Sequence, residues 1–180
     1  MTPRLLVAGI GNIFLGDDAF GVEVARKMAG RPLPAGARVT DFGIRGVHLA
    51  YELLDGYDCL ILVDAVPMGE PPGTVAVIEP EMTDHRGDDA GEGVDAAPVV
   101  DAHSMSPDTV LGMLARLGGR VERVFVVGCQ PARLEEGIGL SPPVAAAVDA
   151  TVGLCAELVS QMMEPAGNQM MQPAGKGTTR

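Results

Sequence analysis

The chain has 180 residues, of which 47% are hydrophobic, and its mean hydropathy is +0.21. This composition is enough for one ordinary core and excludes a disordered acidic protein. The net charge of −11 repels phosphate backbones and anionic lipids, so we expect no nucleic-acid partner and no membrane partner. Three cysteines without a CxxC pair, and no apolar leader, predict a cytoplasmic protein rather than a disulfide scaffold.

Taken in chain order, strand-like and helix-like patterns alternate along the sequence. Short apolar runs predict strands at 5–10, 38–42, 59–63, 74–78 and 121–127. Helical spacing and capping residues predict helices at 17–28, 46–54, 107–117 and 142–163. This alternation is typical of a mainly parallel sheet covered on both faces. We therefore expect a single-domain three-layer α/β/α sandwich over residues 1–163, with a twisted five-stranded sheet.

Two segments depart from this pattern. Residues 79–95 hold seven acidic residues and three glycines, which predicts a solvated loop, with a docking element for a basic partner as the alternative. Residues 164–180 are rich in Pro, Gly, Gln and Thr and repeat a Gln/Glu-Pro-Ala-Gly pattern, which predicts a disordered tail.

In a parallel α/β sheet the working crevice lies at the carboxyl ends of the strands. The first strand ends in a Gly-Ile-Gly-Asn turn that leads to Asp17 and Asp18. A dinucleotide-binding fingerprint is disfavoured, because Phe14 occupies its third glycine position and the acids would repel a pyrophosphate. One of the two acids either caps the following helix or faces the crevice.

Asp64 and His103 are the other candidates for chemistry. Asp64 follows a fully apolar strand, where a carboxylate needs a cation, a metal or hydrogen-bond donors. His103 precedes a predicted helix, and it is either a structural residue or a ligand. An acid from the first loop, Asp64 and His103 could form an open site for a divalent transition metal.

Cys129 follows the fifth strand in a Gly-Cys-Gln-Pro segment. It could be a nucleophile, but no histidine is adjacent in sequence, so we expect a buried structural cysteine.

Several sequence blocks follow one another in a fixed order: GIGNIFLGDDAFG from Gly9, DFGIRG from Asp41, LVDA from Leu62, His103, GCQP from Gly128 and GLSP from Gly139. In this order they resemble the hydrogenase maturation proteases, and the resemblance spans about residues 4–160.

The resemblance implies an endopeptidase with aspartic-type residues. It would remove the C-terminal extension of a [NiFe]-hydrogenase large-subunit precursor after nickel insertion. The implied nickel ligands are Asp18, Asp64 and His103, with Asp18 and Asp64 also catalytic. The nickel would be supplied by the substrate and not held permanently. The implied substrate-cleft residues are Asp17, Gly43, Arg45 and Gly46.

Three alternatives stay open at this stage. A nickel-binding assembly factor would use the same three residues without cutting its partner. A nucleotide-binding enzyme and a cysteine hydrolase using Cys129 are the other two.

Overall fold

The computed structural model describes residues 3–80 and 107–164, which form an α/β fold around one five-stranded sheet. The strand order is β2-β1-β3-β5-β4. Strands β1, β2, β3 and β5 are parallel, and the edge strand β4 is antiparallel to β5. The strands are β1 Leu5–Ile10, β2 Ala37–Gly43, β3 Cys59–Ala65, β4 Val75–Ile78 and β5 Arg123–Cys129.

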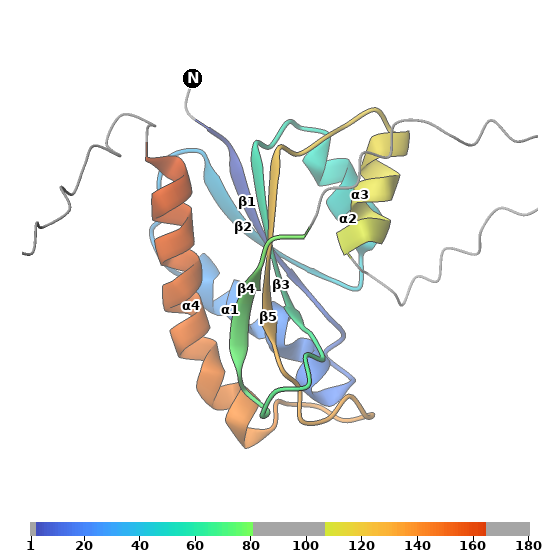
Figure 1. Ribbon diagram of the computed structural model, residues 1–180, viewed down its shortest axis with the longest axis vertical. Helices are drawn as coiled ribbons and strands as arrows, with labels where there is room; N and C mark the ends of the chain where they lie inside the picture. Colours follow the sequence, from blue (N-terminus) through green and yellow to red (C-terminus); the bar gives the residue numbers. More distant parts are fainter. Residues whose placement is uncertain (1–2, 81–106, 165–180) are drawn as a thin grey trace, which may run out of the picture.

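Helices cover both faces of this sheet (Figure 1). On one face lie α1 and α4, and on the other lie α2 and α3, which gives the three layers. The helices are α1 Phe20–Ala29, α2 Gly46–Leu53, α3 Pro107–Arg116 and α4 Pro142–Met163. A 3₁₀ helix, η1 Gly16–Ala19, joins the first loop to α1.

Strand alternation divides the core into two apolar clusters. Along β3, Cys59, Ile61 and Val63 pack toward α1 and α4, while Leu60 and Leu62 pack toward α2 and α3. The central strands are buried on both faces, which explains why their sequences read as continuous apolar runs. Asp64 continues the row of Leu60 and Leu62, so its position faces the α2 and α3 side at the end of the strand.

Glycines allow the start of α1 to approach the strands closely. A Cβ on Gly21 would lie 2.0 Å from the Val63 carbonyl oxygen and 2.4 Å from that of Ile10. A Cβ on Gly9 would lie 2.2 Å from the Gly21 carbonyl oxygen. These contacts are with backbone, which has little room to move, so a side chain at either position would push η1 and α1 away from the sheet.

Helix α4 is the one helix among the described residues that is long and apolar enough to cross a membrane, with a mean hydropathy of 1.4. One of its faces is buried against the core, through Val144, Val148, Val152 and Val159. A helix that covers a sheet meets the same length and composition test, so this property is weak evidence for a membrane span.

The predicted fold class is confirmed, and the differences lie at element boundaries. The first helix begins at Phe20 and not at Asp17, because Asp17 and Asp18 belong to the 3₁₀ turn. Strand β5 begins at Arg123 rather than Val121 and includes Cys129. Strand β3 extends through Asp64 to Ala65, because its pairing with β5 continues to Cys129. The tail 165–180 and all of the acidic segment except Glu79 and Pro80 lie outside the described residues.

Gly21→Ala should destabilise the protein by about 2 kcal/mol, because the new methyl group overlaps two backbone carbonyls. Urea unfolding measures the free-energy change. Gly153→Ala is the matched control, because no atom lies within 4 Å of its added Cβ and it lies within α4. That control should stabilise the protein by about 0.5–1 kcal/mol through helix propensity. Equal effects of the two substitutions would contradict this account of the packing.

Candidate active site

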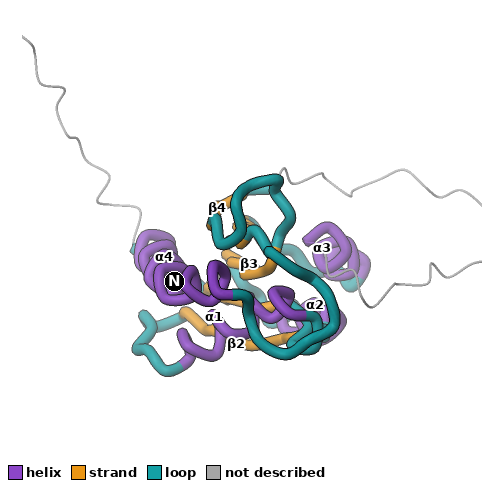
Figure 2. The backbone as a smooth tube through the Cα atoms, turned by 90° about the horizontal axis from the view of Figure 1, so that it is seen from below, coloured by secondary structure: helices purple, strands orange, loops and turns teal. Residues whose placement is uncertain are grey.

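The loops at the carboxyl edge of the parallel strands gather at one end of the molecule, seen from below in Figure 2. They are the β1–α1 loop with η1, the β2–α2 turn, the β3–β4 loop and the segment between β5 and α4. Every predicted site residue that the structure describes lies at this edge. The contacts of each side chain show whether it faces another candidate site residue or bonds to the loops of the protein.

Asp17 is fully buried, and both of its carboxylate oxygens accept hydrogen bonds. Its Oδ2 accepts from the N–H groups of Ala132 (2.8 Å) and Arg133 (3.0 Å) and from the Ser141 hydroxyl (2.9 Å). Its Oδ1 accepts from the N–H of Ser141 at 2.6 Å. Asp17 thus fastens η1 to both ends of the segment between β5 and α4, about 115 to 124 residues later in the chain.

These donors also decide the charge of Asp17. Burial by itself raises the pKa of this carboxyl group, but the hydrogen bonds from Ser141, Arg133 and Ala132 together outweigh it and hold the pKa below its usual value. Asp17 is therefore an ionised carboxylate whose oxygens are occupied by the protein. Its side chain does not line the crevice as the sequence-based hypothesis proposed, because its contacts are internal.

Asp18 has a different environment from its neighbour. It is only partly buried, and among residues 3–80 and 107–164 the one hydrogen bond to its carboxylate comes from the Asn12 N–H to Oδ2 at 2.6 Å. Two backbone hydrogen bonds hold the β1–α1 loop before it. The Leu15 N–H donates to the Asn12 carbonyl, and the Asp18 N–H donates to the Leu15 carbonyl. Asp18 therefore keeps acceptor capacity for a ligand.

Asp64 lies near Asp18 at the end of β3. It is partly buried, and its Oδ1 accepts a hydrogen bond from the N–H of Ala65 at 2.7 Å. Burial raises its pKa to about 8, and the negative charge of Asp18 contributes to this rise against the lowering effect of the Ala65 bond. Two carboxylates that repel each other and lack a basic partner form a site that a cation would stabilise. No ion pair is recorded for either one among residues 3–80 and 107–164.

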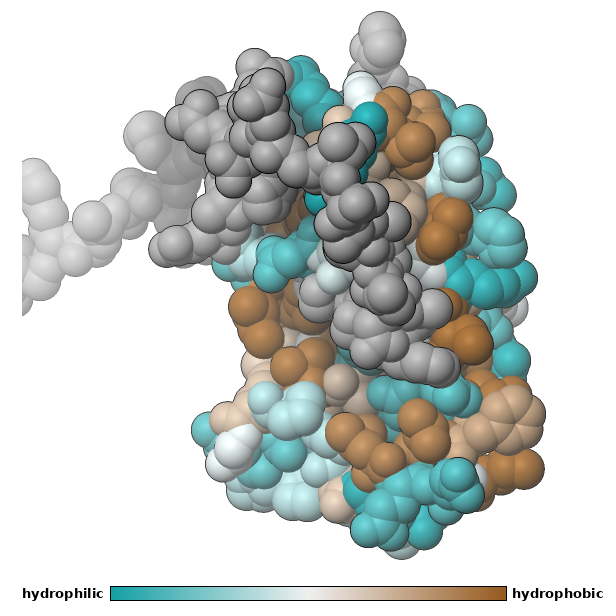
Figure 3. All heavy atoms as spheres, turned by 90° about the vertical axis from the view of Figure 1, so that its right-hand side faces the viewer, coloured by the Kyte–Doolittle hydropathy of each residue, from teal (hydrophilic) through white to brown (hydrophobic). Residues whose placement is uncertain are grey.

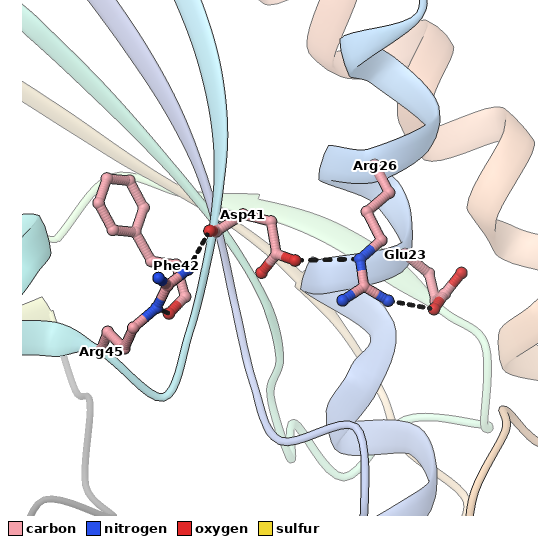
Figure 4. Close-up of polar contacts among 5 residues, drawn as sticks. All are labelled: Glu23, Arg26, Asp41, Phe42 and Arg45. Atoms are coloured by element: carbon pink, nitrogen blue, oxygen red, sulfur yellow. Dashed lines mark hydrogen bonds and ion pairs between the residues drawn. The ribbon is translucent and has the colours of Figure 1, made fainter.

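The β2–α2 turn lies beside the first loop. Gly43 ends β2 with φ +55°, a conformation that favours glycine, and its carbonyl accepts a hydrogen bond from the Gly11 N–H at 3.0 Å. Arg45 turns back on the strand end, and its guanidinium donates to the carbonyls of Phe42 and Asp41 (Figure 4). Gly46 begins α2. Their contact with a substrate stays a prediction.

Figure 4 also shows how the end of β2 is tied to α1. Asp41 accepts from Arg26 Nε at 3.0 Å, and Arg26 pairs with Glu23 one helical turn earlier at 3.5 Å. These exposed pairs contribute little to stability, but they hold the Asp41 carboxylate toward Arg26, on the side away from Arg45.

His103 lies outside the described residues, so the structure says nothing of its distance to Asp18 or Asp64. Within the described part of the chain, no group of three or more His, Cys, Asp or Glu side chains could hold a metal ion. The two carboxylates supply only part of a coordination shell, and a third ligand would have to come from elsewhere in the chain or from a partner.

The sequence pattern did not indicate two residues that position the site. Ser141 donates twice to Asp17, although its place before two prolines indicated only a helix start. Gln130 accepts hydrogen bonds from the N–H groups of Met68 and Glu70, and so fixes the loop that follows Asp64. Both lie in sequence blocks whose residue types gave no sign of the long-range partner.

Cys129 is buried as predicted. Burial, with a smaller contribution from the charge of Asp17, raises the pKa of its thiol to about 11. A thiol that stays protonated at neutral pH is a poor nucleophile, so the cysteine-hydrolase alternative loses its basis.

The chain matches known proteins along most of its length. The model of a family described as hydrogenase maturation protease matches residues 22–158, a segment that begins after Asp18. The hydrogenase expression/formation protein HupM of Azotobacter chroococcum is 31% identical over 162 residues, covering 89% of this chain and 73% of that protein. The hydrogenase 2 maturation protease of Escherichia coli is 31% identical over 153 residues, covering 81% and 84%.

Solved structures agree with the sequence matches. The hydrogenase maturating endopeptidase HybD from E. coli superposes with a TM-score of 0.68 at 28% identity, covering 88% of this chain and 93% of that one. The chain therefore belongs to the hydrogenase maturation protease family, and it is a hydrolase of the endopeptidase type.

Asp17→Asn should destabilise the protein by about 3 kcal/mol at pH 7, since it replaces a buried charged acceptor of four hydrogen bonds. The depressed pKa means that this contribution is present above the usual carboxyl pKa and is lost as the pH falls through the folded-state value. The difference in free energy of unfolding between parent and variant, measured with urea, should therefore become smaller below about pH 4. A variant as stable as its parent at pH 7 would refute the anchoring role.

Asp64→Asn should stabilise the metal-free protein, increasingly so as the pH rises. Between the unfolded-state pKa and about 8 the folded parent holds a proton that the unfolded chain has lost, so its stability falls with rising pH. From pH 5 to pH 8 the difference in free energy of unfolding between variant and parent should increase by about 4 kcal/mol, measured by urea unfolding with a chelator present. In an Asp18→Asn background the widening should be smaller, because one cause of the raised pKa is gone. A gap that does not change with pH would contradict this account.

Proposed function

We propose that this endopeptidase removes the C-terminal extension of a [NiFe]-hydrogenase large-subunit precursor after nickel insertion. Asp18, Asp64 and His103 would recognise the nickel, and Asp18 and Asp64 would also take part in the cleavage. The proposal rests on the family membership and on the resemblance of the sequence blocks around these residues.

One observation of the geometry supports it above the others. Asp64 and Asp18 are close enough for their charges to interact, both are partly buried, and neither has a recorded basic partner among the described residues. Such a pair is unfavourable while it lacks a cation and becomes favourable when one arrives. Carboxylate oxygens with an imidazole suit a divalent transition metal.

The nickel is then part of the substrate. In the free enzyme a proton on Asp64 relieves the repulsion between the two carboxyl groups, and a precursor without nickel offers no cation to replace that proton, whereas a loaded precursor gains coordination by both carboxylates. The difference in affinity between the two forms gives the enzyme its selectivity for mature metal centres.

Cleavage adds water across one peptide bond. Oxygen from water attacks the scissile carbonyl carbon, the C–N bond breaks, and the proton from water ends on the leaving amine. Two routes to water activation are compatible with this geometry: polarisation by the nickel, or proton transfer to Asp64 or Asp18 as general base. A carboxyl group with a pKa near neutrality, as at Asp64, suits the second route.

A non-cleaving assembly factor is the second candidate, because the same carboxylates would bind a nickel-loaded partner without cutting it. We also propose that the protein acts in the cytoplasm. All three cysteines are buried free thiols, in keeping with a reducing compartment.

Intact-mass spectrometry tests the proposal directly. Purified nickel-loaded and nickel-free precursors are incubated with and without the protein. Loss of a C-terminal peptide from the loaded form alone is the expected result. Binding without loss of mass would favour the assembly factor, and cleavage of both forms would contradict recognition through nickel.

Asp18→Asn and Asp64→Asn should each lower the cleavage rate at least a hundredfold while the protein stays folded, because each removes a carboxylate that would coordinate the nickel or accept the proton of water. His103→Ala should mainly weaken binding of the loaded precursor. Asp149→Asn is the matched control, since Asp149 is an exposed residue of α4 that pairs with Lys27. Parental rates in either site variant would refute the assignment.

A further inference from the structure

Large apolar side chains are exposed on two neighbouring loops at the carboxyl edge. Ile138 is 82% exposed, Phe14 is 60% exposed and Leu134 is 44% exposed. Figure 3 shows apolar side chains, in brown, reaching the surface at this lower end of the molecule among polar ones. We call Phe14, Leu134 and Ile138 the apolar tip.

The tip is held by backbone bonds between the loops. The Gly137 N–H donates to the Phe14 carbonyl at 2.9 Å, and the Gly16 N–H donates to the Gly137 carbonyl at 2.8 Å, which forms an isolated bridge between Leu15 and Gly137. Asp17 fastens the base of the same two segments. Exposed apolar groups on a fixed backbone lose little entropy when they bind, so they suit a recognition surface better than mobile ones.

The tip is continuous with the candidate active site. Phe14 lies two residues after Asn12, and the Asn12 side chain accepts the Phe14 N–H at 3.0 Å while its own N–H donates to Asp18. A protein whose peptide bond reaches Asp18 therefore comes close to the loop that carries Phe14.

Acidic groups flank the apolar tip. Glu135 and Glu136 lie between Leu134 and Ile138, both are exposed, and no ion pair is recorded for either within the described ranges. Glu135 and Glu136 outnumber the neighbouring Arg133, whose guanidinium donates to the Gly139 carbonyl. The excess of acids fits an apolar patch edged by basic side chains and disfavours an anionic lipid surface.

We propose that the apolar tip is the surface on which the folded body of the substrate precursor docks, through an apolar patch bordered by basic residues. The inference rests on the proposed function, because it takes the precursor as the substrate. The tip would supply affinity for the folded partner, while the carboxylates at the strand ends carry the chemistry.

Steady-state cleavage of nickel-loaded precursor tests the tip. Ile138→Ser and the double variant Phe14→Ser, Ile138→Ser should raise KM about tenfold or more with kcat nearly unchanged, because they remove contacts made equally in ground and transition states. Ile138→Leu should restore the parental KM. Thermal unfolding should not shift for Ile138→Ser, since its side chain is exposed.

Leu117→Ser is the matched control. Leu117 is 42% exposed, but it follows α3 at the opposite edge of the sheet, so its variant should keep the parental KM. A parental KM in the double tip variant would overturn the docking proposal and leave the proposed function standing, whereas a parent that never cleaves loaded precursor would overturn both. If the parent protein pelleted with phosphatidylglycerol vesicles, the tip would bind lipid and the proposal would be overturned. The same holds if the parent protein self-associated and Ile138→Ser lost this self-association while its KM stayed unchanged, because the tip would then bind a second copy of the chain.

Discussion

The carboxyl edge of this sheet is organised by one buried charge. Asp17 gathers four hydrogen bonds from the segment between β5 and α4, and through them it fixes loops that lie far apart in the sequence. A buried carboxylate without donors would be costly, so the loops that supply these donors can adopt only a narrow set of positions. The turn that carries Asp18 and the bridge below the apolar tip both follow from that constraint.

Adjacent acids in this turn have opposite roles. The donors around Asp17 keep its pKa low and bond both of its oxygens, whereas Asp18 receives one backbone hydrogen bond from the described residues and interacts electrostatically with Asp64. The charge of Asp17 is thus stabilised by donors of the protein itself, whereas the pair of Asp18 and Asp64 would be stabilised by a bound cation. The carboxylate that anchors the loops and the carboxylate proposed to recognise nickel are thus on adjacent residues.

Much of the fold follows from local pattern, while the site follows only in part. Apolar runs such as Leu5–Ile10 and the helical spacing after Phe20 gave the elements, and their alternation gave the parallel sheet. The pattern also located Asp18 and Asp64 at the strand ends. It did not distinguish Asp17 from Asp18, because both are acids in one turn and differ only in the donors that distant segments bring to them.

The sequence by itself determined the fold class, the family and the edge of the sheet at which the candidate site lies, because these depend on periodicity, composition and short motifs. Only the tertiary structure decided which acid is an anchor, that Ser141 and Gln130 hold the loops, and that Phe14 and Ile138 share one exposed tip. Those facts depend on contacts between residues about 60 to 124 positions apart in the chain. No local pattern in the sequence encodes such contacts visibly.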